Sequence, residues 1–282
     1  MENDRRGSGI FLGVIGVATL VVAIIGATFA YFSASAGSGD DALRATSTTV
    51  DLGFNTITSV MKTSMIPAYD NIALAGAAST NTNGVCIDDN GNDICGVYEF
   101  FIGNPSGTTT TQLTASLNVV TNDFVNLYFR IYDITGETPV EVVTPTNLKN
   151  GITSPYTYQE QSYAIATPTY DSNVTFSEDG KTLTLKSLSV TLAPSKAAIT
   201  DGVDTLDNYV TQTNTVGTNT NYKKYRVIVW LRDTGTDQPF DSEKSFSASI
   251  NFTTGTGTGV TGVLAGAGGD LIKGENYTTP AE

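Results

Sequence analysis

The chain has 282 residues and a net charge of −13, with 15 basic against 28 acidic residues. Such an acidic surface repels phosphate backbones and argues against nucleic-acid binding. Histidine is absent, which excludes Ser-His and Cys-His catalysis and His-based zinc sites, and leaves only carboxylate chemistry of the glycosidase kind. Hydrophobic residues make up 40% of the chain and charged residues only 15%, a mixture that is typical of secreted β proteins.

The N-terminus predicts export. Residues 10–32 carry no charge and follow Arg5 and Arg6. As a helix this stretch would be roughly 35 Å long, enough to cross a bilayer core of about 30 Å. Because it is longer than an ordinary signal sequence, residues 1–30 are either a signal peptide or an N-terminal membrane anchor. The remaining chain has no second stretch of this kind, so we expect it outside the membrane, extracellular or on a bacterial cell surface.

Beyond about residue 40 the apolar residues follow the two-residue period of β-strands. Residues 245–252 and 112–119 alternate cleanly between apolar and polar side chains, which predicts strands with one buried face. Residues 97–102 and 225–231 are apolar on both faces and indicate central strands. Residues 124–134 have one apolar face and carry Asn126, Tyr128, Arg130 and Tyr132 on the other, so we expect a strand that is covered on both faces. Many strands at this spacing, separated by turn signals, predict an all-β sandwich or barrel.

Four segments interrupt this simple pattern. A phase slip within residues 181–192 predicts a β-bulge. Residues 57–65 and 203–210 have apolar side chains at helical spacing, so we expect one short helix at each place. Residues 255–282 are rich in Gly and polar residues and predict a flexible tail, which leaves residues 31–254 as the β-sandwich domain.

The two cysteines of the chain predict a disulfide-closed hairpin. Cys86 and Cys95 flank an Asn-Gly dipeptide at residues 90–91, which is the strongest signal for a two-residue type I′ turn. Folding about this turn pairs Ile87 with Ile94 and Cys86 with Cys95. The cysteines then form a non-hydrogen-bonded pair with Cα atoms about 4.5 Å apart, within disulfide range. In an exported chain we expect them to be oxidised together.

Calcium binding is the alternative use of this hairpin. Asp88, Asp89 and Asp93 place several oxygen atoms close together. An EF-hand needs its glycine at the sixth position, whereas Gly91 is the fourth residue counted from Asp88, so that pattern fails. We therefore expect no cofactor, and these three aspartates are the candidate ligands if calcium does bind. Two thiols without histidine cannot complete a zinc site.

Two segments resemble a known group of exported proteins. Residues 27–33, A-T-F-A-Y-F-S, resemble export signals that the SipW-type signal peptidase cleaves before an aromatic residue, which places the cut between Ala30 and Tyr31. Residues 229–240, V-W-L-R-D-T-G-T-D-Q-P-F, and the strand after them are similar to the D-x-G-x-D-Q-x-F stretch of the TasA and camelysin family. The matching positions are Asp233, Gly235, Asp237, Gln238 and Phe240.

This resemblance implies a jelly-roll-like β-sandwich and a structural function. TasA builds extracellular biofilm-matrix fibres in which the freed N-terminal segment completes the sheet of a neighbouring copy. The cysteine hairpin, Pro239 and the Gly-rich tail depart from the family pattern, and these departures bear on the mode of assembly. Camelysin carries a metalloprotease label, but this chain offers no residues for such a site.

Three functions remain open from the sequence. The first is an exported fibre subunit whose partners are copies of itself. The second is a membrane-anchored surface protein that binds a glycan or a host protein, with Tyr156, Tyr158, Tyr163 and Tyr170 as stacking rings, although strand packing explains these tyrosines as well.

The third is a carboxylate enzyme. Nothing in the spacing of the acidic residues sets two of them across a cleft, so we expect no enzyme. The candidates would be Asp123, Asp133, Glu137 and Glu141.

The fate of residues 31–41 separates the first two functions, because a cleaved, mobile segment favours fibres and an uncleaved helix favours an anchor.

Overall fold

The computed structural model describes residues 52–60, 64–71, 73, 85–87, 93–199, 205–255, 259–265 and 272–274. The predicted signal or anchor, its cleavage pair Ala30 and Tyr31, and the segment up to residue 41 lie outside these ranges. Within the described ranges, no helix has the length and apolarity needed to cross a membrane.

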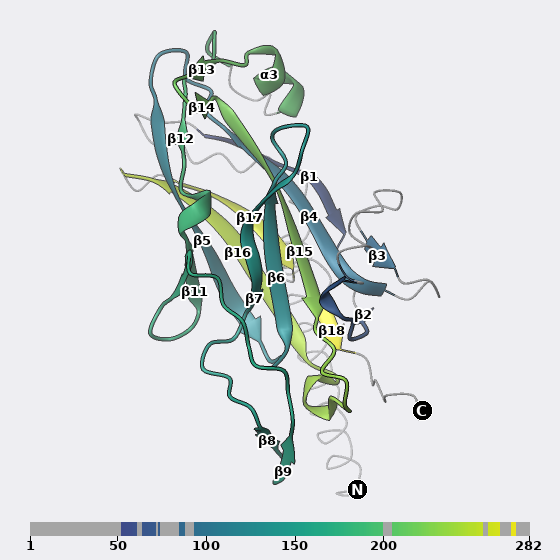
Figure 1. The fold of residues 1–282 in the computed structure, drawn as a ribbon. Coiled ribbons are helices and arrows are strands. Elements are labelled where there is room, and N and C mark those ends of the chain that lie inside the picture. The colour runs from purple at the N-terminus through teal and green to yellow at the C-terminus, as the bar shows by residue number, and fades with distance from the viewer. Residues whose placement is uncertain are drawn as a thin grey trace, which may run out of the picture. The chain divides into compact units, whose positions relative to one another are not determined.

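The described part of the chain is an all-β sandwich, as predicted (Figure 1). The first sheet has the order β1 (Gly53–Val60), β4 (Asp93–Gly103), β15 (Tyr222–Leu231), β6 (Leu127–Asp133) and β7 (Val140–Asn147), and β3 (Val85–Ile87) also pairs with β4. The second has the order β10 (Val174–Phe176), β11 (Thr182–Leu185), β5 (Thr111–Asn122), β16 (Ser245–Thr254), β18 (Ile272–Gly274) and β2 (Ser64–Met65), while β12 (Thr191–Leu192) pairs with β5 and β17 (Gly259–Ala265) with β16.

Smaller elements decorate the two ends of the sandwich. The hairpin of β8 (Tyr156–Tyr158) and β9 (Gln161–Tyr163) lies at one end in Figure 1. Helix α3 (Leu206–Thr211) and the hairpin of β13 (Thr215–Val216) and β14 (Asn219–Thr220) lie at the other. Two short 3₁₀ turns, Lys186–Leu188 and Pro239–Asp241, complete the described elements.

The connections between the sheets follow a wrapped pattern. Strands β5 and β6 are consecutive and lie in different sheets, and so are β15 and β16. In the second sheet β5 pairs with β16, and in the first β6 pairs with β15, both antiparallel. Two consecutive strand pairs wrapped in this way are expected of a jelly-roll-like double sheet.

The core lies between the two sheets and follows the predicted alternation. On β5 and β16 the predicted apolar faces are the buried ones, and the register pairs Leu117 with Ile250 and Ala115 with Phe252. Across the core, the rings of Phe100, Tyr225 and Phe252 contact one another. Side chains on one face of each strand therefore meet those of the other sheet, as expected for packed sheets.

The first sheet is buried on both faces. The central strands carry a second apolar cluster on the outer face, where Val97, Ile228 and Trp230 pack with Ala68 and Ala73. The segment that contains these alanines covers the outer face, so the strands predicted to be covered on both sides are confirmed. A strand with two buried faces reads as a continuous apolar run, which is the pattern of residues 225–231.

The expected helix over residues 57–65 is wrong. Residues 53–60 form β1, and Ser64–Met65 form β2. The register of β1 on β4 shifts between Thr56 and Thr58, which is a bulge at Ile57. A bulge adds one residue and breaks the period of two, so the apolar spacing around it imitates a helix. The shorter predicted helix is confirmed over Leu206–Thr211.

Two further segments differ from expectation. The phase slip in residues 181–192 is not a bulge: strands β11 and β12 both pair with β5, and the 3₁₀ turn Lys186–Leu188 between them absorbs the change of phase. Within the predicted flexible tail, β17 pairs along β16, and β18 pairs with β16 and with β2. Backbone hydrogen bonds to β16 order residues whose composition alone predicts a loop.

Candidate functional site: the edges of the first sheet

The family-like motif shapes the link between β15 and β16. Asp233 Oδ1 accepts a hydrogen bond from Gly235 N at 2.7 Å, and Gly235 has the positive φ of +71° that favours glycine. The amide of Gln238 closes the loop, because Oε1 accepts from Thr234 N at 3.0 Å and Nε2 donates to Arg232 O at 3.0 Å. Asp237 is exposed. These residues therefore fix a turn rather than form a reactive centre.

Asp241 anchors this link to the sandwich and was missed by the sequence analysis. Its carboxylate is 1% exposed and accepts from Val125 N at 2.6 Å, from Asn126 Nδ2 at 3.1 Å and from Gln238 Nε2 at 3.2 Å. Burial raises the pKa of Asp241, while these hydrogen bonds act to lower it. The carboxylate ties the β15–β16 link to the segment before β6.

The aromatic rings of the β8–β9 hairpin pack around Phe240. Tyr156 and Tyr163 meet its ring edge-on at 5.3 and 5.4 Å, and Tyr158 lies at 6.4 Å. Tyr170 packs edge-on against a phenylalanine of β10 at 5.8 Å. Packing accounts for all four tyrosines that the sequence offered as stacking rings for a sugar.

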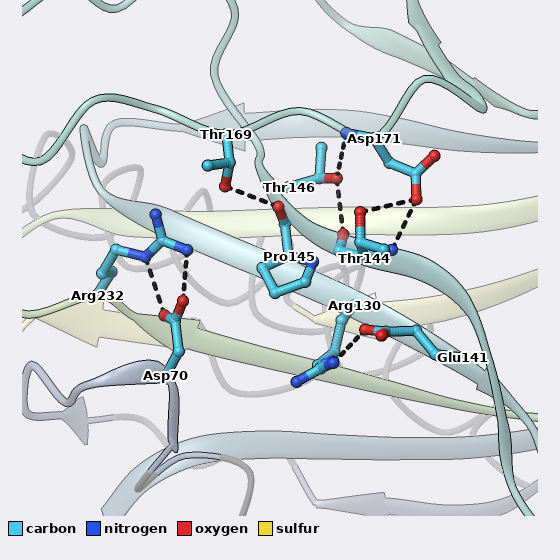
Figure 2. A network of polar contacts seen from close by, with 9 residues as sticks. All are labelled: Asp70, Arg130, Glu141, Thr144, Pro145, Thr146, Thr169, Asp171 and Arg232. Atoms are coloured by element: carbon cyan, nitrogen blue, oxygen red, sulfur yellow. Dashed lines mark hydrogen bonds and ion pairs between the residues drawn. The ribbon is translucent and has the colours of Figure 1, made fainter.

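The outer side of edge strand β7 is covered by residues 169–171 (Figure 2). Asn147 N donates to Thr169 O at 3.0 Å, and Thr169 Oγ1 donates to Pro145 O at 2.9 Å. Asp171 N donates to Thr146 Oγ1 at 2.9 Å. These contacts replace a neighbouring strand for the C-terminal half of β7.

The side chain of Asp171 completes this cover, which we call the β7 clamp (residues 144–147 and 169–171). Its Oδ2 accepts from Thr144 N at 2.7 Å and from Thr144 Oγ1 at 2.9 Å, and its Oδ1 accepts from Asn173 N at 2.7 Å. Burial alone would raise the pKa of Asp171, but the hydrogen bonds from Thr144 and Asn173 outweigh it and lower the pKa. The clamp therefore depends on the ionised carboxylate.

Backbone irregularities also disfavour the pairing of a further strand with β7. The register of β6 on β7 shifts twice, on either side of Ile131, and Pro145 has no N–H to offer a further strand. Natural sheets protect their edges with bulges, prolines and covering loops. The C-terminal half of β7 is thus a blocked edge.

The acidic residues considered for an enzyme form local contacts. Glu141 pairs with Arg130 on the neighbouring strand (Figure 2), and Asp133 binds Lys223 Nζ at 2.8 Å. Asp123 accepts from Ser245 Oγ at 2.9 Å, and Glu137 is exposed. Each of the three bonded carboxylates has a structural partner.

A second contact, the Asp70 latch (Ala68, Asp70 and Arg232), closes the end of β15. Ala68 N donates to Leu231 O at 2.9 Å, and Asp233 N donates to Ala68 O at 3.0 Å. The Asp70 carboxylate accepts from Arg232 Nε at 2.9 Å and Nη2 at 2.6 Å (Figure 2), and also from Trp230 Nε1 at 3.0 Å. This bidentate pair holds the covering segment on the outer face of the first sheet.

The opposite edge of the first sheet is different. Strand β1 pairs with β4 on one side, and among the described residues no strand pairs with its outer side. A single bulge at Ile57 is the only register shift in its pairing with β4. Strand β3 continues this side along β4, with Val85 opposite Gly96 where β1 ends with Val60 opposite Val97.

The start of β1 is held by a tyrosine ring in a slot between two glycines. Gly53 and Gly103 face each other across β1 and β4, and Tyr209 of α3 lies over both. A Cβ on Gly53 would lie 1.7 Å from the Tyr209 hydroxyl, and one on Gly103 would lie 2.3 Å from its ring. The glycines are needed here for space, and the ring covers the backbone that they leave bare.

The cysteine hairpin is confirmed in its pairing and corrected in its register. Cys86 lies opposite Cys95 as predicted, but Ile87 pairs with Asp93 and not with Ile94. This shift is a bulge, which the two-residue turn did not anticipate. Cys95 is 1% exposed. The disulfide itself stays a prediction.

The calcium site is likewise untested. Asp88 and Asp89 lie outside the described residues, and only the strand position of Asp93 is known. Within the residues that the structure does describe, no group of three or more metal-ligating side chains is brought together.

Comparisons with known proteins leave the family unassigned. No protein-family model matches the chain, and no curated protein sequence is significantly similar to it. Among solved structures, the chain is similar to the major pilin subunit of Bacillus cereus, with a TM-score of 0.28 and 8% identity over 80% of this chain. The match covers 41% of that pilin, so the chain spans well under half of its length. The resemblance to TasA and camelysin therefore stays a prediction.

Proposed function

We propose that the chain is an exported structural subunit of extracellular fibres or biofilm matrix, located at the surface of a bacterium and without enzymatic activity. The observation that carries this proposal is the asymmetry of the first sheet. The C-terminal half of its β7 edge is covered by the clamp, whereas the outer side of β1 has no strand partner among the described residues. Backbone groups left on one edge are a template for another strand.

The segment after the predicted cleavage site supplies that strand. Residues 31–41 begin with Tyr31 and Phe32 and continue with small polar residues. Adding this segment to β1 of another copy would satisfy the edge and bury the aromatic pair, as in other strand-addition systems. Head-to-tail addition does not close on itself, so it extends into a filament. The net charge of −13 opposes lateral clumping, so filament formation should respond to salt.

The test compares a chain that begins at Tyr31 with one that begins at Asp40. The longer chain is expected to form filaments visible by electron microscopy, and the shorter one to stay monomeric. Hydrogen exchange then identifies the acceptor edge, because β1 amides should become protected on assembly while β7 amides stay unchanged.

Two results would contradict the proposal. If both chains remain monomeric at high concentration and varied salt, the fibre function fails, and a membrane-anchored surface protein that binds a glycan or host protein takes its place. If filaments form but protection increases at β7, strand addition at β1 is wrong.

A further inference from the structure

An asparagine-glycine pair forms an exposed corner directly after β7. Asn150 and Gly151 lie in the turn by which the chain leaves the first sheet, and both residues are exposed. Asparagine is chemically labile, and its side-chain amide is lost fastest where the next residue is glycine, because no side chain then shields the main-chain nitrogen that attacks it. The function proposed above does not use this corner.

The side chain of Asn150 already faces the nitrogen of Gly151. Gly151 N donates a hydrogen bond to Asn150 Oδ1 at 2.9 Å, so the carboxamide and this nitrogen lie on the same side of the main chain. A Cβ added at Gly151 would meet nothing within 4 Å, so the space beside the nitrogen is open to solvent. Gly151 has a φ of +73°, and glycine can leave this conformation at little cost when the main chain closes into a ring.

Asn147, at the end of β7, is held in the opposite way. Its side chain is buried, Nδ2 donates to Val125 O at 2.9 Å, and Oδ1 accepts from Lys149 N at 2.7 Å. The next residue is the buried Leu148, whose N donates to Leu127 O at 2.9 Å. The amide group and the nitrogen that would attack it are both occupied, so Asn147 should be unreactive.

We propose that Asn150 and Gly151 form a self-modification site, at which the chain converts Asn150 into aspartate and isoaspartate. The Gly151 nitrogen attacks Asn150 Cγ while solvent base takes its proton, and the new N–Cγ bond closes a succinimide ring. The Cγ–Nδ2 bond then breaks, and the amide leaves as ammonia with a proton from water. The reaction needs no oxidant, no reductant and no other protein.

Water then opens the ring at one of its two carbonyl groups. Opening at Cγ gives aspartate, and opening at the main-chain carbonyl gives isoaspartate, in which the main chain runs through Cβ and Cγ. Either product adds one negative charge to the corner. The anchors just before it should hold the end of β7, because Leu148 N is bonded to Leu127 O and Lys149 O accepts from Tyr170 Oη at 3.0 Å. The proposal does not depend on fibre assembly, since the reaction takes place within a single copy.

The experiment incubates the full folded chain in neutral and in mildly alkaline buffer and follows its peptides by mass spectrometry. Cleavage after glutamate releases residues 142–160, which contain both Asn147 and Asn150, so Asn147 is an internal control. Two further Asn-Gly pairs, at residues 83–84 and 90–91, fall in other peptides and lie outside the described residues. Deamidation is expected at Asn150 and not at Asn147, faster in alkaline buffer, with both aspartate and isoaspartate distinguished by electron-transfer fragmentation.

Asn150→Gln is the matched variant, because a glutamine side chain would have to close a larger ring, which forms more slowly. The variant should lose the deamidation signal from the peptide of residues 142–160. Its melting temperature should stay unchanged, since Asn150 is exposed.

Three results would overturn the proposal. An intact Asn150 in the folded chain, with the urea-unfolded chain as the reference for full reactivity, would show that the turn prevents ring closure. Aspartate without isoaspartate would mean that water attacks the side chain directly and that Gly151 N takes no part. Equal loss of the amide at Asn147 would mean that the reaction follows unfolding and not the geometry of the corner.

Discussion

The two edges of the first sheet differ in how the outward-facing backbone N–H and C=O groups of their strands are covered. Strand β7 ends the sheet with two register shifts, a proline and a carboxylate that occupies a backbone N–H. Strand β1 ends it with one bulge, and among the described residues its outer side has no strand partner. Edge protection in this sheet is therefore local, since the contacts that cover β7 lie in its C-terminal half.

The anchors of the two sides differ as well. On the β1 side, a ring packs into a glycine slot over β1 and β4, and Cys86 of β3 lies opposite Cys95 of β4. On the β7 side, hydrogen bonds to one ionised carboxylate hold the covering loop. Ring packing does not titrate in acid, whereas a carboxylate does, so the stability of the two sides should respond differently to mutation and to pH.

The largest change in the free energy of unfolding is expected at the cysteine pair on the β1 side. If Cys86 and Cys95 form the predicted disulfide, reduction should lower the free energy of unfolding by about 2–3 kcal/mol. Urea denaturation with and without reductant measures this, and the Cys86→Ala, Cys95→Ala double variant should not respond to reductant. Mass measurement with alkylation gives an independent check, and free thiols in the native exported protein would rule the disulfide out.

The next largest change in stability tests whether Gly53 and Gly103, which form the glycine slot, are needed to make room for the Tyr209 ring. Gly103→Ala should destabilise the protein by roughly 1–3 kcal/mol, because the new methyl overlaps the Tyr209 ring. In a Tyr209→Ala background the same substitution should cost much less, since the ring is gone. Gly136→Ala is the control, because a Cβ there meets nothing within 4 Å. Additive effects of the two substitutions would show that ring and glycine are not coupled.

The smallest effect tests the β7 clamp through pH. The pKa of Asp171 is lowered in the folded state, so the ionised carboxylate adds stability above its unfolded pKa of about 3.9, and this is lost as pH falls through the folded pKa. Asp171→Asn should cost about 1 kcal/mol at neutral pH and flatten the fall in stability toward about pH 3.

The exposed Glu137 provides the control for the clamp. Glu137→Gln should leave the pH dependence close to that of the unaltered chain, because its side chain is exposed and makes no clamp contact. An Asp171→Asn profile parallel to the unaltered one would mean that the clamp does not depend on charge.

The sequence predicts the structure correctly where the alternation of apolar and polar residues directly gives the buried face of a strand. The alternation in β5 and β16 predicted their buried sides, and the two-faced apolar runs predicted the central strands β4 and β15. It fails where an irregularity changes the period. The bulge at Ile57 imitates a helix, and the turn Lys186–Leu188 imitates a bulge.

The residues that matter most for the candidate sites depend on distant partners. The role of Asp171 depends on Thr144, and the role of Gly103 depends on Tyr209. The sequence by itself determined an acidic, all-β chain without histidine, because composition and period-two alternation are local properties. Only the tertiary structure decided which carboxylate covers β7 and which glycines make room for a ring, because each depends on residues brought together by folding from remote positions in the chain.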